Sequence, residues 1–220
     1  RTPIGIPMGH KIYSNVEIGE GTIIEDGCMI GIPPRGKKDG ELKTVIGNDC
    51  IIRSGTYIYA GNVIGDHFQT GNKVNIRESN DIGANVSIGT LSVIEHHVKI
   101  EDDVRIHTQV FVPEFCVLKK GCWLGPNVVL TNAPHPLCPK VKECLKGPTI
   151  FEGAIIGANA TLLPSVMIGR KALVGAASLV TKDVAPLTVV AGNPAKYIKD
   201  VKDLKCHYPH LGIDKPYEDD

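Results

Sequence analysis

The chain has 220 residues, with 24 basic and 24 acidic side chains and only 5% aromatic residues. This balance of charge argues against a nucleic-acid or polyanion binder, because such a protein needs a basic surface. No apolar run approaches the roughly 18 residues of a membrane-spanning helix, so no membrane insertion is expected. Seven cysteines without the spacing of a compact disulfide framework favour a reducing, cytoplasmic location.

An aliphatic residue recurs every six positions along most of the chain. Residues 1–11 precede this pattern and are predicted to form an N-terminal extension. The pattern then begins with four isoleucines: Ile12, Ile18, Ile24 and Ile30. A period of six fits neither a helix nor a long alternating strand. It fits short strands separated by tight turns, with three strands closing a triangular coil of about 18 residues.

The first interruption of the period is residues 31–45, a polar stretch predicted to form a loop. The period resumes at Ile46 and continues to Leu130, with one non-aliphatic member at Thr70. A glycine often follows the aliphatic residue, as at Gly47 and Gly65, where we expect a turn that needs φ > 0. Stacked coils of this kind bury one continuous column of aliphatic side chains.

A second loop is predicted over residues 131–149, after which the period returns from Ile150 to Val180. The coil array is therefore expected to span residues 12–186, with both loops leaving it at corners. Loops on a rigid scaffold are where binding and catalytic groups usually lie. In the remaining segment, 187–220, the spacing of apolar residues predicts a short helix over Ala195–Lys205 that begins after Pro194.

The hexapeptide period resembles that of the hexapeptide-repeat acyltransferase superfamily. The resemblance implies an all-β fold, a left-handed parallel β-helix, and a homotrimer with active sites between subunits. The segment from Gly125 through His135 and Pro136 resembles galactoside and maltose O-acetyltransferases, which implies that His135 is the general base. A neutral imidazole can accept a proton from an attacking hydroxyl or amine at neutral pH. The beginning of this segment also resembles sugar-nucleotide N-acetyltransferases.

The residues from Val174 to Lys196 resemble the acetyl-CoA-binding end of these acetyltransferases. The resemblance implies pantetheine contacts at the backbone of Ala158 and Ala176. It also implies contacts near the adenine and the phosphates of CoA at four further side chains: Thr181, Lys182, Lys196 and Lys199. Lysine can bind a phosphate as a point charge.

Residues upstream of His135 are candidates for binding the acceptor, a sugar or an amino sugar. They are Arg105, His107, Gln109 and Glu114. The acceptor-binding carboxylate of the galactoside enzymes does not recur cleanly, because Pro113 falls near its position with Glu114 beside it. Both N- and O-acetylation, and a nucleotide-linked acceptor, remain open.

His135, Cys138 and Cys144 share one loop and are residue types that bind zinc, but three ligands do not complete a structural site. We therefore expect no metal. The leading interpretation is an acetyl-CoA-dependent acetyltransferase that transfers the acetyl group directly. A non-catalytic hexapeptide scaffold is the alternative, and a zinc hydratase of the γ-carbonic-anhydrase type is a weaker one.

Overall fold

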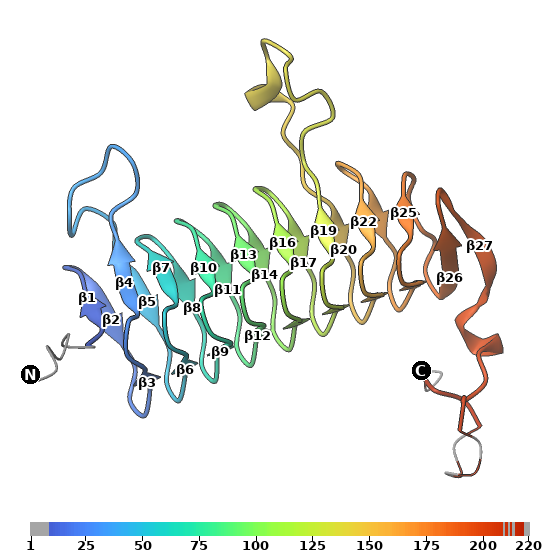
Figure 1. The fold of residues 1–220 in the computed structure, drawn as a ribbon, viewed down its shortest axis with the longest axis horizontal. Helices are drawn as coiled ribbons and strands as arrows, with labels where there is room; N and C mark the ends of the chain where they lie inside the picture. Colours follow the sequence, from blue (N-terminus) through green and yellow to red (C-terminus); the bar gives the residue numbers. More distant parts are fainter. Residues whose placement is uncertain (1–8, 209, 211, 213, 218–220) are drawn as a thin grey trace, which may run out of the picture.

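The computed structural model describes residues 9–208, 210, 212 and 214–217, and shows a three-sided prism of stacked coils (Figure 1). Each face of the prism is a sheet, and successive coils contribute strands that pair in parallel. Ile76 pairs with Ile94 in the next coil, so one coil spans 18 residues. The predicted parallel β-helix of hexapeptide repeats is confirmed.

The strands fall into three sheets, which we call A, B and C. Sheet A has nine strands: β1 (Lys11–Ile12), β4 (Met29–Ile32), β7 (Tyr57–Tyr59), β10 (Asn75–Ile76), β13 (Val93–Ile94), β16 (Phe111–Val112), β19 (Val129–Leu130), β22 (Thr161–Leu162) and β25 (Leu179–Val180). Sheet B has eight: β2 (Val16–Ile18), β5 (Thr44–Ile46), β8 (Val63–Ile64), β11 (Asp81–Ile82), β14 (Lys99–Ile100), β17 (Val117–Leu118), β20 (Thr149–Ile150) and β23 (Met167–Ile168). Sheet C has ten: β3 (Ile23–Ile24), β6 (Ile51–Ile52), β9 (Gln69–Thr70), β12 (Ser87–Ile88), β15 (Arg105–Ile106), β18 (Trp123–Leu124), β21 (Ile155–Ile156), β24 (Leu173–Val174), β26 (Thr188–Gly192) and β27 (Ala195–Asp200).

The core is the aliphatic column expected from the period. Ile58, Ile76 and Ile94 are fully buried at the same position of successive coils. The turn residue four positions later also faces inward, as Val74 and Val98 do. Because the inward side chains are nearly all branched or small, three short strands can close around them without large rings.

The glycines that follow the column residues do not supply the positive φ that we expected. That conformation occurs two residues later, for example at Asp49 and His67. The glycine is needed for another reason: a Cβ on Gly65 would lie 2.7 Å from the backbone nitrogen of Ala84 in the next coil. The glycines therefore allow successive coils to approach closely, and the prediction of φ > 0 at these positions was wrong.

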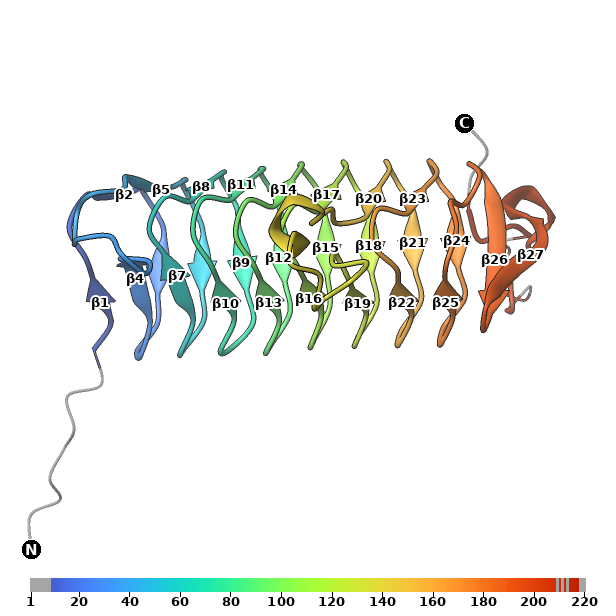
Figure 2. The same cartoon turned by 90° about the horizontal axis from the view of Figure 1, so that it is seen from above.

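Both long loops leave the prism at the edge between sheets A and B and project to the same side (Figure 1). The first occupies residues 33–43 between β4 and β5, and the second occupies 131–148 between β19 and β20. The second loop contains a 3₁₀ turn, η1 (Val141–Glu143). Seen from above, this loop lies over the β14–β18 region of the prism (Figure 2).

The C-terminal segment differs from the prediction. Ala195–Asp200 forms β27, which pairs antiparallel with β26, and only Val201–Asp203 makes a helical turn, η2 of the 3₁₀ type. The end of sheet C offers unpaired backbone groups, and β27 satisfies part of that edge with hydrogen bonds that a helix would not supply. Of the predicted N-terminal extension, residues 1–11, the first eight lie outside the described residues. No helix in the described part of the chain has the length and apolar character to cross a bilayer.

Candidate active site

The loop 131–148 presents His135 to solvent. The loop is closed at its base, because the backbone nitrogen of Lys146 donates to the carbonyl oxygen of Asn132 at 2.9 Å. The carbonyl oxygen of His135 accepts a hydrogen bond from the backbone nitrogen of Cys138 at 3.0 Å. The imidazole is therefore accessible on a loop with internal backbone hydrogen bonds, which suits a group that must meet a substrate.

Glu114 lies at the foot of this loop. One carboxylate oxygen accepts a hydrogen bond from the side-chain nitrogen of Asn132 at 2.7 Å. The other lies 3.6 Å from Nε2 of His96. Of the expected acceptor-binding residues, Glu114 is thus the one that the structure brings to the base of the His135 loop.

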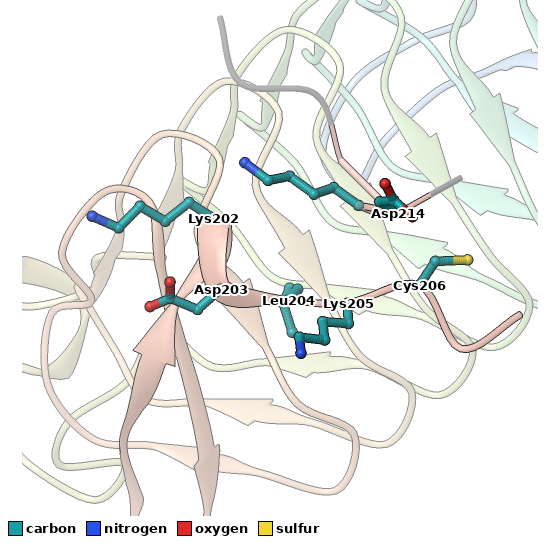
Figure 3. A pocket seen from close by; sticks show the side chains of 7 residues that line it. Lys202, Asp203, Leu204, Lys205, Cys206 and Asp214 are labelled. Atoms are coloured by element: carbon teal, nitrogen blue, oxygen red, sulfur yellow. The ribbon is translucent and has the colours of Figure 1, made fainter. Parts of the chain in front are cut away.

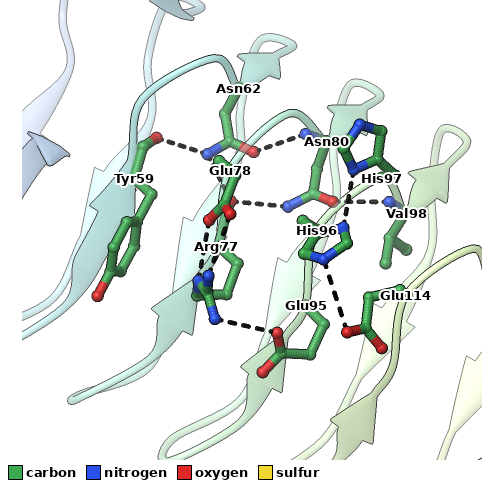
Figure 4. A network of polar contacts seen from close by, with 10 residues as sticks. All are labelled: Tyr59, Asn62, Arg77, Glu78, Asn80, Glu95, His96, His97, Val98 and Glu114. Carbon is green, nitrogen blue, oxygen red and sulfur yellow. Dashed lines mark hydrogen bonds and ion pairs between the residues drawn. The ribbon is translucent and has the colours of Figure 1, made fainter. Parts of the chain in front are cut away.

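A polar cluster continues from Glu114 along the edge between sheets A and B, toward the first loop (Figure 4). Arg77 contacts both Glu78 and Glu95 there, at 2.9 and 3.3 Å. Burial is the largest influence on Glu78 and opposes ionisation, yet the hydrogen bonds from Arg77 hold the pKa of Glu78 below its usual value. Burial raises the pKa of Glu95, and the nearby carboxylate of Glu114 adds to this effect while Arg77 opposes it.

Of this cluster, only Glu114 was predicted from the sequence as a site residue. The signal of the cluster is the regular spacing of Glu78, His96, Glu114 and Asn132, which are 18 residues apart and therefore occupy one position of four successive coils. Spacing by 18 could have found them once the coil length was known, because it places polar residues in a row along an edge.

The other three expected acceptor-binding residues lie elsewhere. Arg105 projects from β15 and donates to the backbone and side-chain oxygens of Asn85. The ring of His107 packs against Trp123 at 4.6 Å between centroids. His107 and Gln109 belong to the turn from sheet C to sheet A, and His107 lines a shallow groove of about 240 Å³. Within a single chain, these three residues and Glu114 therefore lie at different edges of the prism.

Ala158 and Ala176 also lie on the edge between sheets C and A. Each follows a glycine in the turn after its strand, β21 or β24. In other turns the equivalent backbone nitrogen donates to a side chain of the next coil, as Asn72 donates to Thr90 at 3.2 Å. Among the described residues, the backbone nitrogens of Ala158 and Ala176 have no such acceptor. Two backbone donors are therefore available to the carbonyl groups of a bound molecule.

Beyond these alanines, a cavity of about 290 Å³ lies near the C-terminal end of the prism. Lys182 lines it together with Thr188 and Tyr197. Thr181 is next to Lys182 and half-buried. Lys196 and Lys199 are exposed on β27 and do not line this cavity, although Ala195 and Tyr197 of the same strand do.

A larger cavity, of about 600 Å³, lies between η2 and the C-terminal residues (Figure 3). Three lysines and two aspartates line it, with Leu204 and Cys206. The full set is Lys202, Asp203, Leu204, Lys205, Cys206, Asp214 and Lys215. These residues were not predicted as a site, since the alternating charges of this segment are typical of any exposed surface.

The cysteines form two classes. Cys116 and Cys122 are buried in the core, and burial raises the pKa of both thiols, that of Cys122 to about 12. Cys138 is half-buried and Cys144 exposed on the His135 loop. Within the described residues, no three His, Cys, Asp or Glu side chains are grouped so that they could bind a metal ion.

Comparison with known proteins agrees with this architecture. A family model described as "Hexapeptide repeat of succinyl-transferase" matches residues 149–182. Galactoside O-acetyltransferase of Escherichia coli (strain K12) is 30% identical over 130 residues, which are 57% of this chain and 59% of that protein. The bifunctional protein GlmU of Listeria innocua is 33% identical over 189 residues, 81% of this chain and 38% of that protein. The chain thus spans less than two thirds of the length of these relatives.

A solved structure of similar fold is UDP-N-acetylglucosamine acyltransferase of Francisella novicida. It superposes with a TM-score of 0.72 at 19% sequence identity, over 94% of this chain and 72% of that one. At this identity the similarity concerns the fold. The coil period and the three parallel sheets are those of a parallel β-helix, the fold of this structure is similar to that of the Francisella novicida enzyme, and residues 149–182 match the hexapeptide-repeat family model.

Proposed function

We propose that this protein is an acetyl-CoA-dependent acetyltransferase whose acceptor is a sugar or an amino sugar, including a nucleotide-linked one. The observation that carries the proposal is His135, exposed on a loop whose base is closed by hydrogen bonds. The relatives named as galactoside O-acetyltransferases support the same activity.

The donor side of the reaction fits the other edge of the prism. A pantetheine arm has two amide carbonyl groups that can accept hydrogen bonds, and the backbone nitrogens of Ala158 and Ala176 are free to donate to them. Lys182, at the rim of the nearby cavity, supplies a positive charge for the phosphates of CoA. Lys196 and Lys199 are exposed on β27 and remain candidates for the same role.

In the proposed reaction, neutral His135 accepts the proton of the acceptor hydroxyl or amine as that group attacks the thioester carbonyl carbon. The new C–O or C–N bond forms, the C–S bond breaks, and the proton on the imidazole passes to the departing thiolate of CoA. A backbone N–H near the cleft would stabilise the developing oxyanion. No covalent enzyme intermediate is required.

A homotrimer would complete this site. The His135 loop leaves the edge between sheets A and B after β19, whereas Ala158 follows β21 on the edge between sheets C and A. These two features belong to neighbouring coils and so lie at a similar height along the prism. Parallel copies side by side would bring the loop of one copy over the C–A edge of the next, together with Arg105, His107 and Gln109. Leu137, 98% exposed on the loop, would then be covered.

The test combines a binding and an activity measurement. Acetyl-CoA and CoA should raise the melting temperature, and product mass spectrometry with a panel of sugars and amino sugars should show an added acetyl group. His135→Ala should lower turnover roughly 10²–10⁴-fold with an unchanged melting temperature, because an exposed side chain adds little to the core. Light scattering should give three chains per particle.

Three outcomes would count against the proposal. Absence of both CoA binding and product would favour a non-catalytic scaffold. A loss of less than about tenfold in His135→Ala would remove the base assignment while leaving acetyl transfer in place. A monomer at micromolar concentration would exclude a site shared between copies.

A further inference from the structure

Four side chains form a row along the edge between sheets A and B, which we call the edge row: Glu78, His96, Glu114 and Asn132. Each is the second residue after a buried column residue, and the parallel register of sheet A places them one coil apart. Successive members are therefore separated by about 4.8 Å of rise, which is hydrogen-bonding reach for side chains of this length. Figure 4 shows the first three members.

Glu114 is the member with contacts on both sides. Its Oε2 accepts from Nδ2 of Asn132 at 2.7 Å, and its Oε1 lies 3.6 Å from Nε2 of His96. His96 is in turn positioned by His97, since their Nδ1 atoms are 2.8 Å apart, and by the ring of Phe115. Both carboxylate oxygens of Glu114 thus have a partner within the chain.

Asn132 is the point at which the His135 loop leaves the prism. It is 9% exposed, and its carbonyl oxygen accepts from Lys146, where the loop returns. The carbonyl oxygen of Lys146 accepts in turn from the backbone nitrogen of Ser165 in the next coil, at 2.9 Å. Both ends of the loop therefore meet at Asn132, and the side chain of Asn132 is bound by Glu114.

We propose that Glu114 is a positioning residue: its carboxylate, held between His96 and Asn132, sets the exit of the loop and so the place of the His135 imidazole. This inference rests on the proposed function for its kinetic consequence, and it replaces the expected contact between Glu114 and the acceptor. A hydrogen bond to a carboxylate is stronger than one to a neutral acceptor, which suits an anchor at a half-buried site. His135 lies three residues beyond the anchored side chain, so a displaced Asn132 moves the base directly.

The kinetic test uses Glu114→Ala and Glu114→Gln. Glu114→Ala removes the nearer acceptor of the Asn132 amide, at 2.7 Å, and leaves only the backbone carbonyl oxygen of residue 114, at 3.3 Å. It should lower kcat about 10–100-fold, with the KM values for acetyl-CoA and for the sugar changed less than twofold. Glu114→Gln keeps a carbonyl oxygen for the Asn132 amide and should recover most of kcat. Asn132→Ala should resemble Glu114→Ala, and the double variant should be no worse than either single one.

Glu101→Ala is the matched control. Glu101 is also a turn carboxylate with two partners, since it accepts from Lys119 at 2.7 Å and from the backbone nitrogen of Lys120 at 3.1 Å. It lies on the edge between sheets B and C, away from the loop, and its removal should leave kcat unchanged.

A second measurement does not depend on activity. Amide hydrogen exchange at Lys146 and Ser165 reports the closure of the loop base, and both amides should exchange at least tenfold faster in Glu114→Ala than in the parent. The proposal is overturned by unchanged exchange in Glu114→Ala and Asn132→Ala, or by a raised acceptor KM that Glu114→Gln does not restore. If the parent chain transfers no acetyl group, the proposed function fails while the exchange experiment still decides whether Glu114 anchors the loop.

Discussion

The hydroxyl oxygens of Thr56 and Thr70 lie 3.3 Å apart, and both side chains are buried inside the prism. Thr70 occupies a column position that is otherwise aliphatic, and its hydroxyl also accepts from the backbone nitrogen of Arg53 at 2.9 Å. Thr56 can donate to the carbonyl oxygen of Gly71 at 3.3 Å. The one polar interruption of the period is therefore satisfied by hydrogen bonds within the core.

The first prediction follows from this pair. Thr70→Val should lower the free energy of unfolding by about 1–2 kcal/mol, because it leaves the Arg53 amide without its acceptor and the Thr56 hydroxyl with only the Gly71 carbonyl oxygen. The double variant with Thr56→Val should lose less free energy of unfolding than the sum of the two single variants, by about 0.5–1.5 kcal/mol. Urea unfolding of the four proteins measures this coupling. As a control, the stability losses of Thr161→Val, on a distant coil, and Thr70→Val should be additive. If the losses of Thr56→Val and Thr70→Val were additive as well, that result would contradict the pairing.

The second prediction concerns the donor. Lys182→Ala should raise the KM for acetyl-CoA about 10–100-fold and leave the KM for the sugar nearly unchanged, because it removes one charge-assisted contact with a phosphate. Steady-state kinetics with each substrate varied in turn makes the comparison. Lys99→Ala, on β14 of sheet B, is the control of equal charge change. Equal losses for both substrates would indicate damage to the fold and not a donor contact.

The third prediction tests the close approach of coils. A Cβ on Gly157 would lie 2.5 Å from the backbone nitrogen and 2.8 Å from the Cα of Ala176, and backbone atoms of a stacked coil cannot move alone. Gly157→Ala should therefore destabilise the chain by about 1–3 kcal/mol in chemical unfolding. Gly9→Ala has open space around the added methyl group and should be neutral. Equal stability of the two variants would mean that the coils can separate at little cost.

The fourth prediction is an alkaline loss of stability. Burial raises the pKa of Cys122 to about 12 from the 9.0 of an ordinary thiol. Between these pH values the thiol has lost its proton in the unfolded chain but keeps it in the folded chain. The free energy of unfolding therefore falls as the pH rises from about 9 toward 12, with a slope that corresponds to at most one proton for this thiol. Cys122→Ala should reduce that slope in urea unfolding at several pH values. Ala154 fills the same position one coil later, so the smaller side chain is compatible with the column. An unchanged slope would show that Cys122 does not titrate in the unfolding reaction.

The fold was accessible from the sequence because one physical constraint repeats. Each coil must bury an aliphatic residue at the same place, so the position of Ile76 is repeated by Ile94 and by Val112. The end of the array has no such repetition. Tyr197 and Ile198 satisfy a helical spacing, but the free edge of β26 selects a strand for that segment, and this edge exists only once the prism is formed.

The site was accessible in part. The loop that carries His135 breaks the period and is visible in the sequence, whereas the contact between Glu114 and Asn132 depends on which corner each turn occupies. The same limit explains why Arg105 and His107 were grouped with Glu114. They are close in sequence, but a three-sided coil turns to a new face every six residues, so neighbours along the chain point to different sides.

The stacking of coils also determines the separation of the two long loops. They leave sheet A after β4 and after β19, and four strands, β7, β10, β13 and β16, lie between those two. With about 4.8 Å between neighbouring strands, the loop exits are about 24 Å apart. Loss or gain of one 18-residue coil would change this distance by a single step while every inward residue stayed inward. Whatever contacts both loops at once is thus selected by the number of coils, a property that insertion or deletion of whole repeats can alter without changing any residue of either loop.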